Sequence, residues 1–102
     1  MKIVATNGTD NIEVLKVNYE GLPIDFTVYG VTRIDVIAGD ITMSSGGGNV
    51  SYTDSQISIK FGKMGLAVGK YDVIIKLITP ASPNGVVIVG PERPQCIVLF
   101  VS

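Results

Sequence analysis

The chain has 102 residues, of which 46% are apolar and 17% are charged, and its formal net charge is -1. This composition excludes a disordered chain and supplies one hydrophobic core, so we expect a single domain over residues 1–102. Eight basic residues against nine acidic ones lack the positive surplus of a nucleic-acid-binding domain, and we expect no nucleic-acid partner.

Missing residue types exclude several kinds of chemistry. The chain has no His and a single cysteine, Cys96, so it contains no imidazole base, no Ser-His-Asp triad and no His-ligated metal. One thiol forms no internal disulfide and no four-thiolate zinc site. We therefore expect no cofactor. An enzyme would need two carboxylates brought together in a cleft, which a sandwich of this size rarely offers, so we expect no enzymatic activity.

The sequence predicts neither a targeting signal nor a membrane span. The apolar run at its start is too short for a secretion signal. No stretch approaches the roughly 18 apolar residues of a transmembrane helix. We expect the chain to fold in a reducing cytoplasm and to have no membrane partner.

The predicted elements are strands. Val, Ile and Thr are abundant, Gly or Pro interrupts almost every stretch longer than ten residues, and no window keeps helical spacing over three turns. In chain order we expect strands at residues 2–6, 11–19, 24–36, 41–43, 57–61, 71–78, 86–89 and 96–101. Their spacing of about ten residues is typical of an all-β antiparallel sandwich or barrel.

The predicted strand over 24–36 is unusually long. Its inward phase holds Ile24, Phe26, Val28, Thr32, Ile34 and Val36. Because a strand of this length rarely runs straight, Gly30 is expected to mark a bend or bulge.

The segment 44–49 is rich in Ser and Gly. A phosphate-binding loop would need Gly-Lys-Ser/Thr leading into a helix, and neither feature follows, so a solvated hairpin loop is favoured. A second loop is predicted over 79–85, because two prolines remove backbone donors and Asn-Gly favours positive φ.

Strands 57–61 and 71–78 alternate most clearly. Ile57, Ile59 and Phe61 are expected to point inward from the first strand. The inward phase of the second strand holds Tyr71, Val73, Ile75 and Leu77.

The residues just before strand 71–78 predict a tyrosine corner. In immunoglobulin-like sandwiches a Tyr near the start of strand F bonds a backbone group a few residues upstream through its hydroxyl. Tyr71 would take this part, Leu66 would plug the base of the sandwich, and Gly69 would permit a close approach. An ordinary aromatic at a strand start is the alternative. Without the Cys-Trp-Cys pattern of antibody domains, we expect a disulfide-free, fibronectin-like sandwich.

Five segments of the sequence resemble small virion proteins of tailed bacteriophages, which are immunoglobulin-like modules encoded among tail, baseplate and head-decoration genes. They are Val-Thr-Arg-Ile-Asp-Val at 31–36, Ile-Lys-Phe-Gly at 59–62, Gly-Leu at 65–66, Gly-Lys-Tyr-Asp at 69–72 and Pro-Asn-Gly-Val-Val at 83–87. The resemblance covers residues 31–88. It implies a structural or adhesive role in a phage virion, with assembly in the host cytoplasm, and it carries over no catalytic residue.

Apolar side chains on both faces of the last strands predict an interface. Residues 86–89 and 96–101 are apolar at nearly every position, whereas a two-layer sandwich needs one apolar face per strand. Exposed apolar patches mark partner surfaces, so we expect docking on other virion proteins or on a second copy. Loop cover or a closed barrel is the alternative. The expected interface residues are Ile74, Ile78, Val86, Ile88, Val98 and Phe100.

Acidic and basic residues offer weaker candidates. A calcium site at Asp40 and Asp54 lacks the close carboxylate spacing that calcium needs, so solvated surface is favoured. The acids of the alternating segments are expected on outer faces, and they are Glu13, Glu20, Asp25 and Asp35. The lysines of residues 60–76 are expected to aid solubility rather than to bind nucleic acid, and they are Lys60, Lys63, Lys70 and Lys76.

Exposed tyrosines offer one further function. Binding of a host surface glycan needs aromatic rings free to stack on sugar, and the chain has no Trp. Tyr19, Tyr29 and Tyr52 are the tyrosines expected to be free of the core, with Tyr52 beside the glycine-rich loop.

Overall fold

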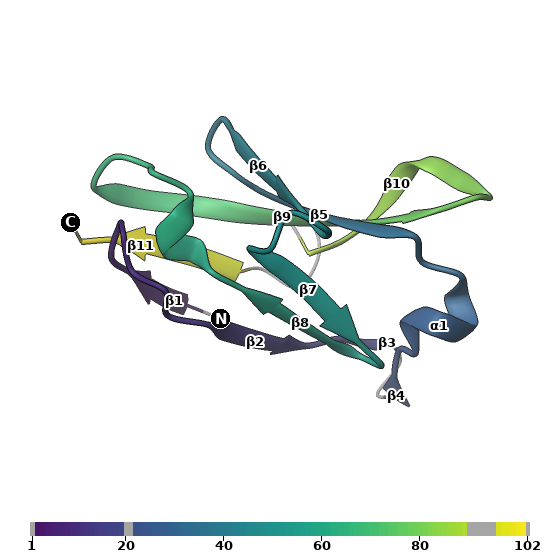
Figure 1. Ribbon diagram of the computed structural model, residues 1–102. Helices are drawn as coiled ribbons and strands as arrows, with labels where there is room; N and C mark the ends of the chain where they lie inside the picture. The colour runs from purple at the N-terminus through teal and green to yellow at the C-terminus, as the bar shows by residue number, and fades with distance from the viewer. Residues whose placement is uncertain (1, 20–21, 90–95, 102) are drawn as a thin grey trace.

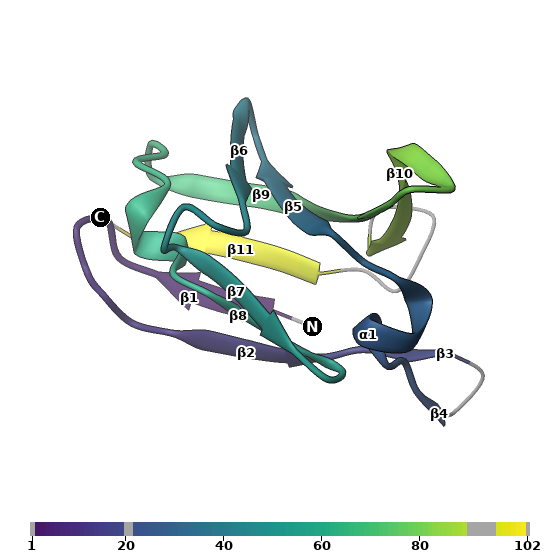
Figure 2. The ribbon, with the colours of Figure 1, turned by 45° about the vertical axis from the view of Figure 1, so that its right-hand side comes forward.

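The computed structural model describes residues 2–19, 22–89 and 96–101. Over these residues the chain forms two sheets that pack face to face, with almost no helix (Figure 1). Strands β9 and β5 lie above β7, β8 and β2 when the molecule is turned (Figure 2). The predicted all-β sandwich is therefore confirmed.

The larger sheet has six strands in the order β1-β11-β9-β5-β6, with β10 also paired to β9. Its strands are β1 (Lys2–Ala5), β5 (Arg33–Ala38), β6 (Ile41–Ser44), β9 (Gly69–Thr79), β10 (Ser82–Val89) and β11 (Cys96–Phe100). The smaller sheet has the order β2-β8-β7, with β2 (Glu13–Lys16), β7 (Val50–Thr53) and β8 (Gln56–Ile59). The short strands β3 (Asn18–Tyr19) and β4 (Leu22–Pro23) pair with each other. The helical turns are α1 (Phe26–Tyr29) and the 3-10 turn η1 (Phe61–Lys63).

The strand order is that of an immunoglobulin-type sandwich. The row β11-β9-β5-β6 corresponds to strands G-F-C-C′ of such a domain, and β2-β8-β7 corresponds to B-E-D. Pairing is antiparallel, as predicted, in every ladder of the described residues except β1 with β11, which run parallel.

The core lies between the two sheets and contains no buried polar side chain among the described residues. The inward phases predicted for two strands are confirmed, because Ile57, Ile59 and Phe61 are buried. In β9, Val73, Ile75 and Leu77 are buried as well, and Tyr71 is half-buried against the core.

The predicted strand over 24–36 is wrong in its first half, where the chain forms α1. Asp25 caps this turn, since its Oδ1 accepts hydrogen bonds from the backbone N–H groups of Thr27 (2.9 Å) and Val28 (3.3 Å). Gly30 ends it in the left-handed region, with φ 73°. Phe26 is buried as expected, but Val28, predicted to point inward, is 84% exposed.

The predicted loop over 79–85 is largely a strand. Residues 80–81 form the turn between β9 and β10, and β10 begins at Ser82. A register shift between Ser82 and Val86 accommodates Pro83 and Gly85. Proline lacks a backbone N–H donor, and an irregular strand that pairs on one side tolerates this loss, while glycine often marks such an irregularity. The resulting hairpin projects at the same end of the molecule as α1 (Figure 1).

The glycine-rich segment crosses between the sheets rather than closing a hairpin. It joins β6 of the larger sheet to β7 of the smaller one. Ser45 fixes its start, because the Ser45 N–H donates to the Ile34 carbonyl (2.9 Å) and the Ile34 N–H donates to Ser45 Oγ (3.0 Å). Since a strand follows instead of a helix, the segment lacks the geometry of a phosphate-binding loop.

Candidate interaction surface

The outer face of the larger sheet has an apolar centre. Ile37 of β5 lies directly opposite Ile74 of β9 in the ladder. The next pair along, Val36 with Ile75, is fully buried, and successive residues of a strand point to opposite faces. Ile37 and Ile74 therefore point outward, and both are half-buried.

More apolar side chains surround this pair on the same face. The register places each of them in the outward phase of its strand, and they are Val4 of β1, Ile78 of β9, Val87 of β10, and Ile97 and Leu99 of β11. Val4 is 57% exposed, and the others are half-buried. The face thus presents a set of aliphatic side chains that do not pack in the protein's own core.

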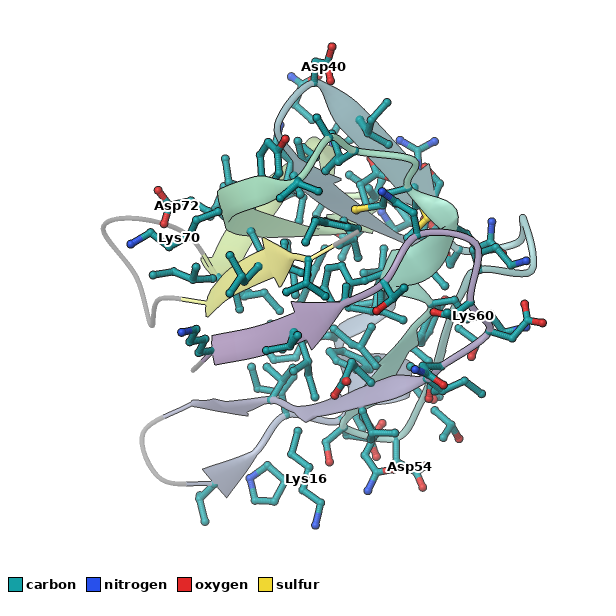
Figure 3. The ribbon with its side chains drawn as sticks, turned by 90° about the vertical axis from the view of Figure 1, so that its left-hand side faces the viewer. Lys16, Asp40, Asp54, Lys60, Lys70 and Asp72 are labelled. Carbon is teal, nitrogen blue, oxygen red and sulfur yellow. The ribbon has the colours of Figure 1, made fainter. Side chains whose placement is uncertain are left out.

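Charged residues of β9 flank Ile74 on its own strand. Asp72 precedes it by two residues and Lys76 follows it by two, so all three point to the outer face. Figure 3 shows Lys70 and Asp72 projecting from the same side of the sheet.

A second charged group on this face is held within the molecule. Asp35 accepts hydrogen bonds from Arg33 Nε (3.0 Å) and Nη2 (3.2 Å) and from Ser44 Oγ (2.7 Å). Asp35 lies opposite Lys76 in the ladder. Its carboxylate is therefore fixed by β5 and β6, at the edge of the apolar centre.

The outer face of the smaller sheet is polar by comparison. Ser51 of β7 pairs with Ser58 of β8, and Thr53 pairs with Gln56. The one apolar residue in the outward phase of its three strands is Val14, which is 50% exposed. Because a sandwich needs no apolar outer face, this contrast marks the larger sheet as the candidate interaction surface.

The outward orientation predicted for the interface residues agrees with the structure in β9 and disagrees with it in β11. Ile74 and Ile78 point outward, as expected. Val98 and Phe100 are fully buried, because they pair with Tyr71 and Gly69 on the core side of β9. In a continuous apolar run the sequence does not determine which alternate residues face inward. The pairing of β11 with β9 turns Val98 and Phe100 inward, the opposite of the predicted orientation.

In β10 the predicted outward orientation is wrong for Ile88, whereas Val86 is exposed as expected. Ile88 packs against the core beside Val89, since a register shift lies at this point of the strand. Val86 is 48% exposed, but it pairs with Leu77 in the inward phase, on the projecting hairpin. Sequence reasoning missed Ile37, although its position between Val36 and Ala38 in an alternating strand was a usable signal.

The tyrosine corner has the predicted hydrogen bond. Tyr71 Oη donates to the Ala67 carbonyl at 2.9 Å, and the Tyr71 ring meets Phe100 edge to face with centroids 5.9 Å apart. Leu66 is buried beside them, as expected.

The glycine that permits the close approach at the corner is Gly39 rather than Gly69. A Cβ at Gly69 would lie 3.7 Å from Tyr71 Oη, which is ordinary contact. A Cβ at Gly39 would lie 3.2 Å from both Leu66 Cδ2 and the Tyr71 ring, and Gly39 has φ 60°. The expected role of Gly69 is corrected accordingly.

An exposed ion pair ties the loop after β1 to η1. Lys63 Nζ lies 2.8 Å from Asp10 Oδ1. The hydrogen bond and positive charge of Lys63 lower the pKa of Asp10. Gly62 packs so closely beneath this loop that an added Cβ would lie 2.6 Å from the Thr6 carbonyl oxygen. These contacts hold the loop after β1 against η1.

The other predicted charged sites do not assemble. Asp40 and Asp54 lie at opposite extremes of the molecule, and Lys60 lies far from Lys70 (Figure 3). Among the described residues no group of three His, Cys, Asp or Glu side chains is placed to hold a metal ion.

Glu20 and the side chain of Tyr19 lie outside the described residues. In the described part of the chain, no helix has the length and hydropathy of a membrane span.

An open cavity of about 360 Å³ lies beside the glycine-rich segment. It is lined by Thr32, Ser45, Gly46, Val50, Ser51 and Tyr52. Tyr52 is engaged within the protein, because its hydroxyl donates to the Val31 carbonyl (3.0 Å) and its ring meets Phe26 edge to face. Tyr29 of α1 is 58% exposed.

Comparison with known proteins identifies no relative: no family model, no curated protein and no solved structure matches the chain. The functional assignment therefore depends on the surface described above.

Proposed function

We propose that the chain is a non-enzymatic structural module that docks on other subunits of an assembly through the outer face of its larger sheet. The resemblance of residues 31–88 to small immunoglobulin-like virion proteins of tailed phages favours a virion as that assembly, built in the host cytoplasm. In this proposal the partners are other virion proteins or a second copy of the chain.

The difference between the two outer faces supports this proposal. The larger sheet presents Ile37, Ile74 and Ile97 where the smaller sheet presents Ser51 and Ser58. These aliphatic side chains are exposed to water on one face only. A partner that covers them stabilises the complex by roughly 25 cal/mol per Å² of apolar surface buried. The smaller sheet offers little such gain, and it would remain in solvent.

Mass spectrometry of purified particles tests the proposal. In this experiment the gene is kept at its own locus. The chain should then co-purify with the particle at a fixed ratio to the major structural proteins. Ile74→Asp should leave the chain folded but reduce its incorporation by about tenfold or more, because a charge is then buried against the partner. Ser58→Asp, on the other sheet, is the matched control and should be incorporated normally. A chain found only in the soluble fraction contradicts the proposal.

Saccharide binding is the second candidate function, because Tyr29 is exposed and Tyr52 lines the open cavity. It is the less favoured, since the hydroxyl and ring of Tyr52 already have partners within the protein. A glycan array decides between the two. Binding that is lost in Tyr29→Ala or Tyr52→Ala and retained in Ile74→Asp would favour the saccharide function, and no binding to any host envelope glycan would exclude it.

A further inference from the structure

We propose that the outer face of the larger sheet binds a second copy of the chain, around a two-fold axis that crosses the strands at Ile74 and Ile37. This inference rests on the proposed docking face and names its occupant. Two identical faces associate well only when their charges are complementary under the symmetry operation. The charge pattern of β9 meets this condition in one orientation.

In that orientation the axis lies in the interface, perpendicular to the strands, so β9 of one copy runs antiparallel to β9 of the other. Asp72 and Lys76 are equally far from Ile74 along the strand and point to the same side. Rotation about Ile74 places Asp72 over the partner's Lys76, and Lys76 over the partner's Asp72. Each dimer therefore contains two such opposite-charge contacts on either side of an isoleucine centre.

A face-to-face dimer with its two-fold axis parallel to the strands is disfavoured by the same residues. An axis parallel to the strands would place Asp72 over the partner's Asp72 and Lys76 over the partner's Lys76. Like charges pressed together at an interface are destabilising. The sequence of β9 thus selects the antiparallel arrangement.

The neighbouring strands fit the selected arrangement. β10 and β11 lie along the same edge of β9, since β5 occupies the other edge. Ile97 is opposite Asp72, and Val87 is opposite Lys76. The rotation that exchanges Asp72 with Lys76 therefore also places Ile97 over the partner's Val87, which brings apolar groups together.

Lys76 is available for this contact. The acidic residue nearest to it in the ladder, Asp35, already accepts hydrogen bonds from Arg33 and Ser44. Within the described residues Lys76 has no ion pair or hydrogen bond of its own. An opposite charge from a second copy would supply one.

The area of the face suits a weak dimer. The strands of this face, β1, β5, β9, β10 and β11, contain 34 residues, and each residue covers about 16 Å² of sheet. The face thus covers roughly 550 Å², below the 800 Å² or so that each partner contributes to a standard interface. We expect association that depends on protein concentration and weakens with salt.

Sedimentation equilibrium of the full chain over a wide concentration range tests the inference. Wild type should show a monomer–dimer equilibrium. Asp72→Lys and Lys76→Asp should each weaken dimerisation about tenfold, because each places like charges at both contacts. The double variant Asp72→Lys/Lys76→Asp should restore the wild-type constant. Lys16→Asp is the matched control, because it makes the same charge change on the other sheet and should have no effect.

Cysteine cross-linking gives a second measurement that depends less on stability. In a Cys96→Ser background, Ile74→Cys lies on the axis and should be linked to its symmetry mate by a bis-maleimide with a reach of about 10 Å, the spacing of sheets packed face to face, whereas Ser58→Cys should not. A wild-type chain that stays monomeric at millimolar concentration, a double variant that does not recover, or equal cross-linking of the two cysteine variants overturns the inference. A monomeric chain that still needs Ile74 for particle incorporation overturns the dimer alone. A dimer that never enters particles overturns the docking function.

Discussion

Removing the hydroxyl of Tyr71 tests whether the tyrosine corner stabilises the sandwich. Tyr71→Phe deletes the 2.9 Å hydrogen bond to the Ala67 carbonyl and leaves the ring against Phe100. A hydrogen bond contributes about 0.5–1.5 kcal/mol, and because this one is exposed, water can replace part of it. We therefore expect a loss of about 0.5–1 kcal/mol in the free energy of unfolding, which corresponds to about 2–8 °C in Tm for a domain of this size.

Thermal and urea unfolding followed by circular dichroism measure this effect. Tyr29→Phe is the control, because Tyr29 is 58% exposed and its hydroxyl has no hydrogen-bond partner among the described residues. That variant should change stability by less than about 0.5 kcal/mol. Tyr71→Ala should cost more than Tyr71→Phe, about 2–3 kcal/mol, since the half-buried ring is then lost as well. If Tyr71→Phe and Tyr29→Phe unfold alike, the corner hydrogen bond contributes nothing to stability.

Three further variants probe the framework that holds the sheets. Gly62→Ala should destabilise the protein by about 2 kcal/mol or more in urea unfolding, because the new Cβ would lie 2.6 Å from the Thr6 carbonyl oxygen; wild-type stability would refute that close packing. Asp25→Ala should cost about 1 kcal/mol by the same measurement, through loss of the α1 cap, and no change would mean that the cap is dispensable. Lys63 lowers the pKa of Asp10, so the stability from this pair is present above the unfolded-state pKa of Asp and is lost as pH falls through the lowered value. Asp10→Asn should therefore reduce the loss of stability as pH falls below the ordinary pKa of Asp, about 4, and an unchanged pH profile would contradict the pairing.

Alternation predicted the strands whose two faces differ in polarity. Ile57 and Ile59 alternate with Ser58 and Lys60, so only one phase of that strand is able to face a core. The same argument placed Val73 and Ile75 of β9 correctly. A corner tyrosine was predictable because its geometry depends on local residues that precede a strand.

The failures have local and long-range causes. Asp25 and Gly30 were usable signals for the cap and end of a helical turn, and they override an alternation that put Val28 inside. The phase of Val98 and Phe100 was not predictable from an apolar run, because it depends on pairing with β9. For the same reason the apolar centre at Ile37 and Ile74 emerged only when the register joined two segments far apart in the sequence.

Hydroxyl-radical footprinting of the chain, alone at low concentration and within purified particles of the virion that we propose as its assembly, tests most directly the proposal that the larger sheet carries the interface. Ile74 and Ile37 should be labelled in the isolated chain and protected in the particle, and Val14 on the smaller sheet should be labelled equally in both. Equal labelling of Ile74 in the two states, or protection of Val14 in its place, would contradict the account.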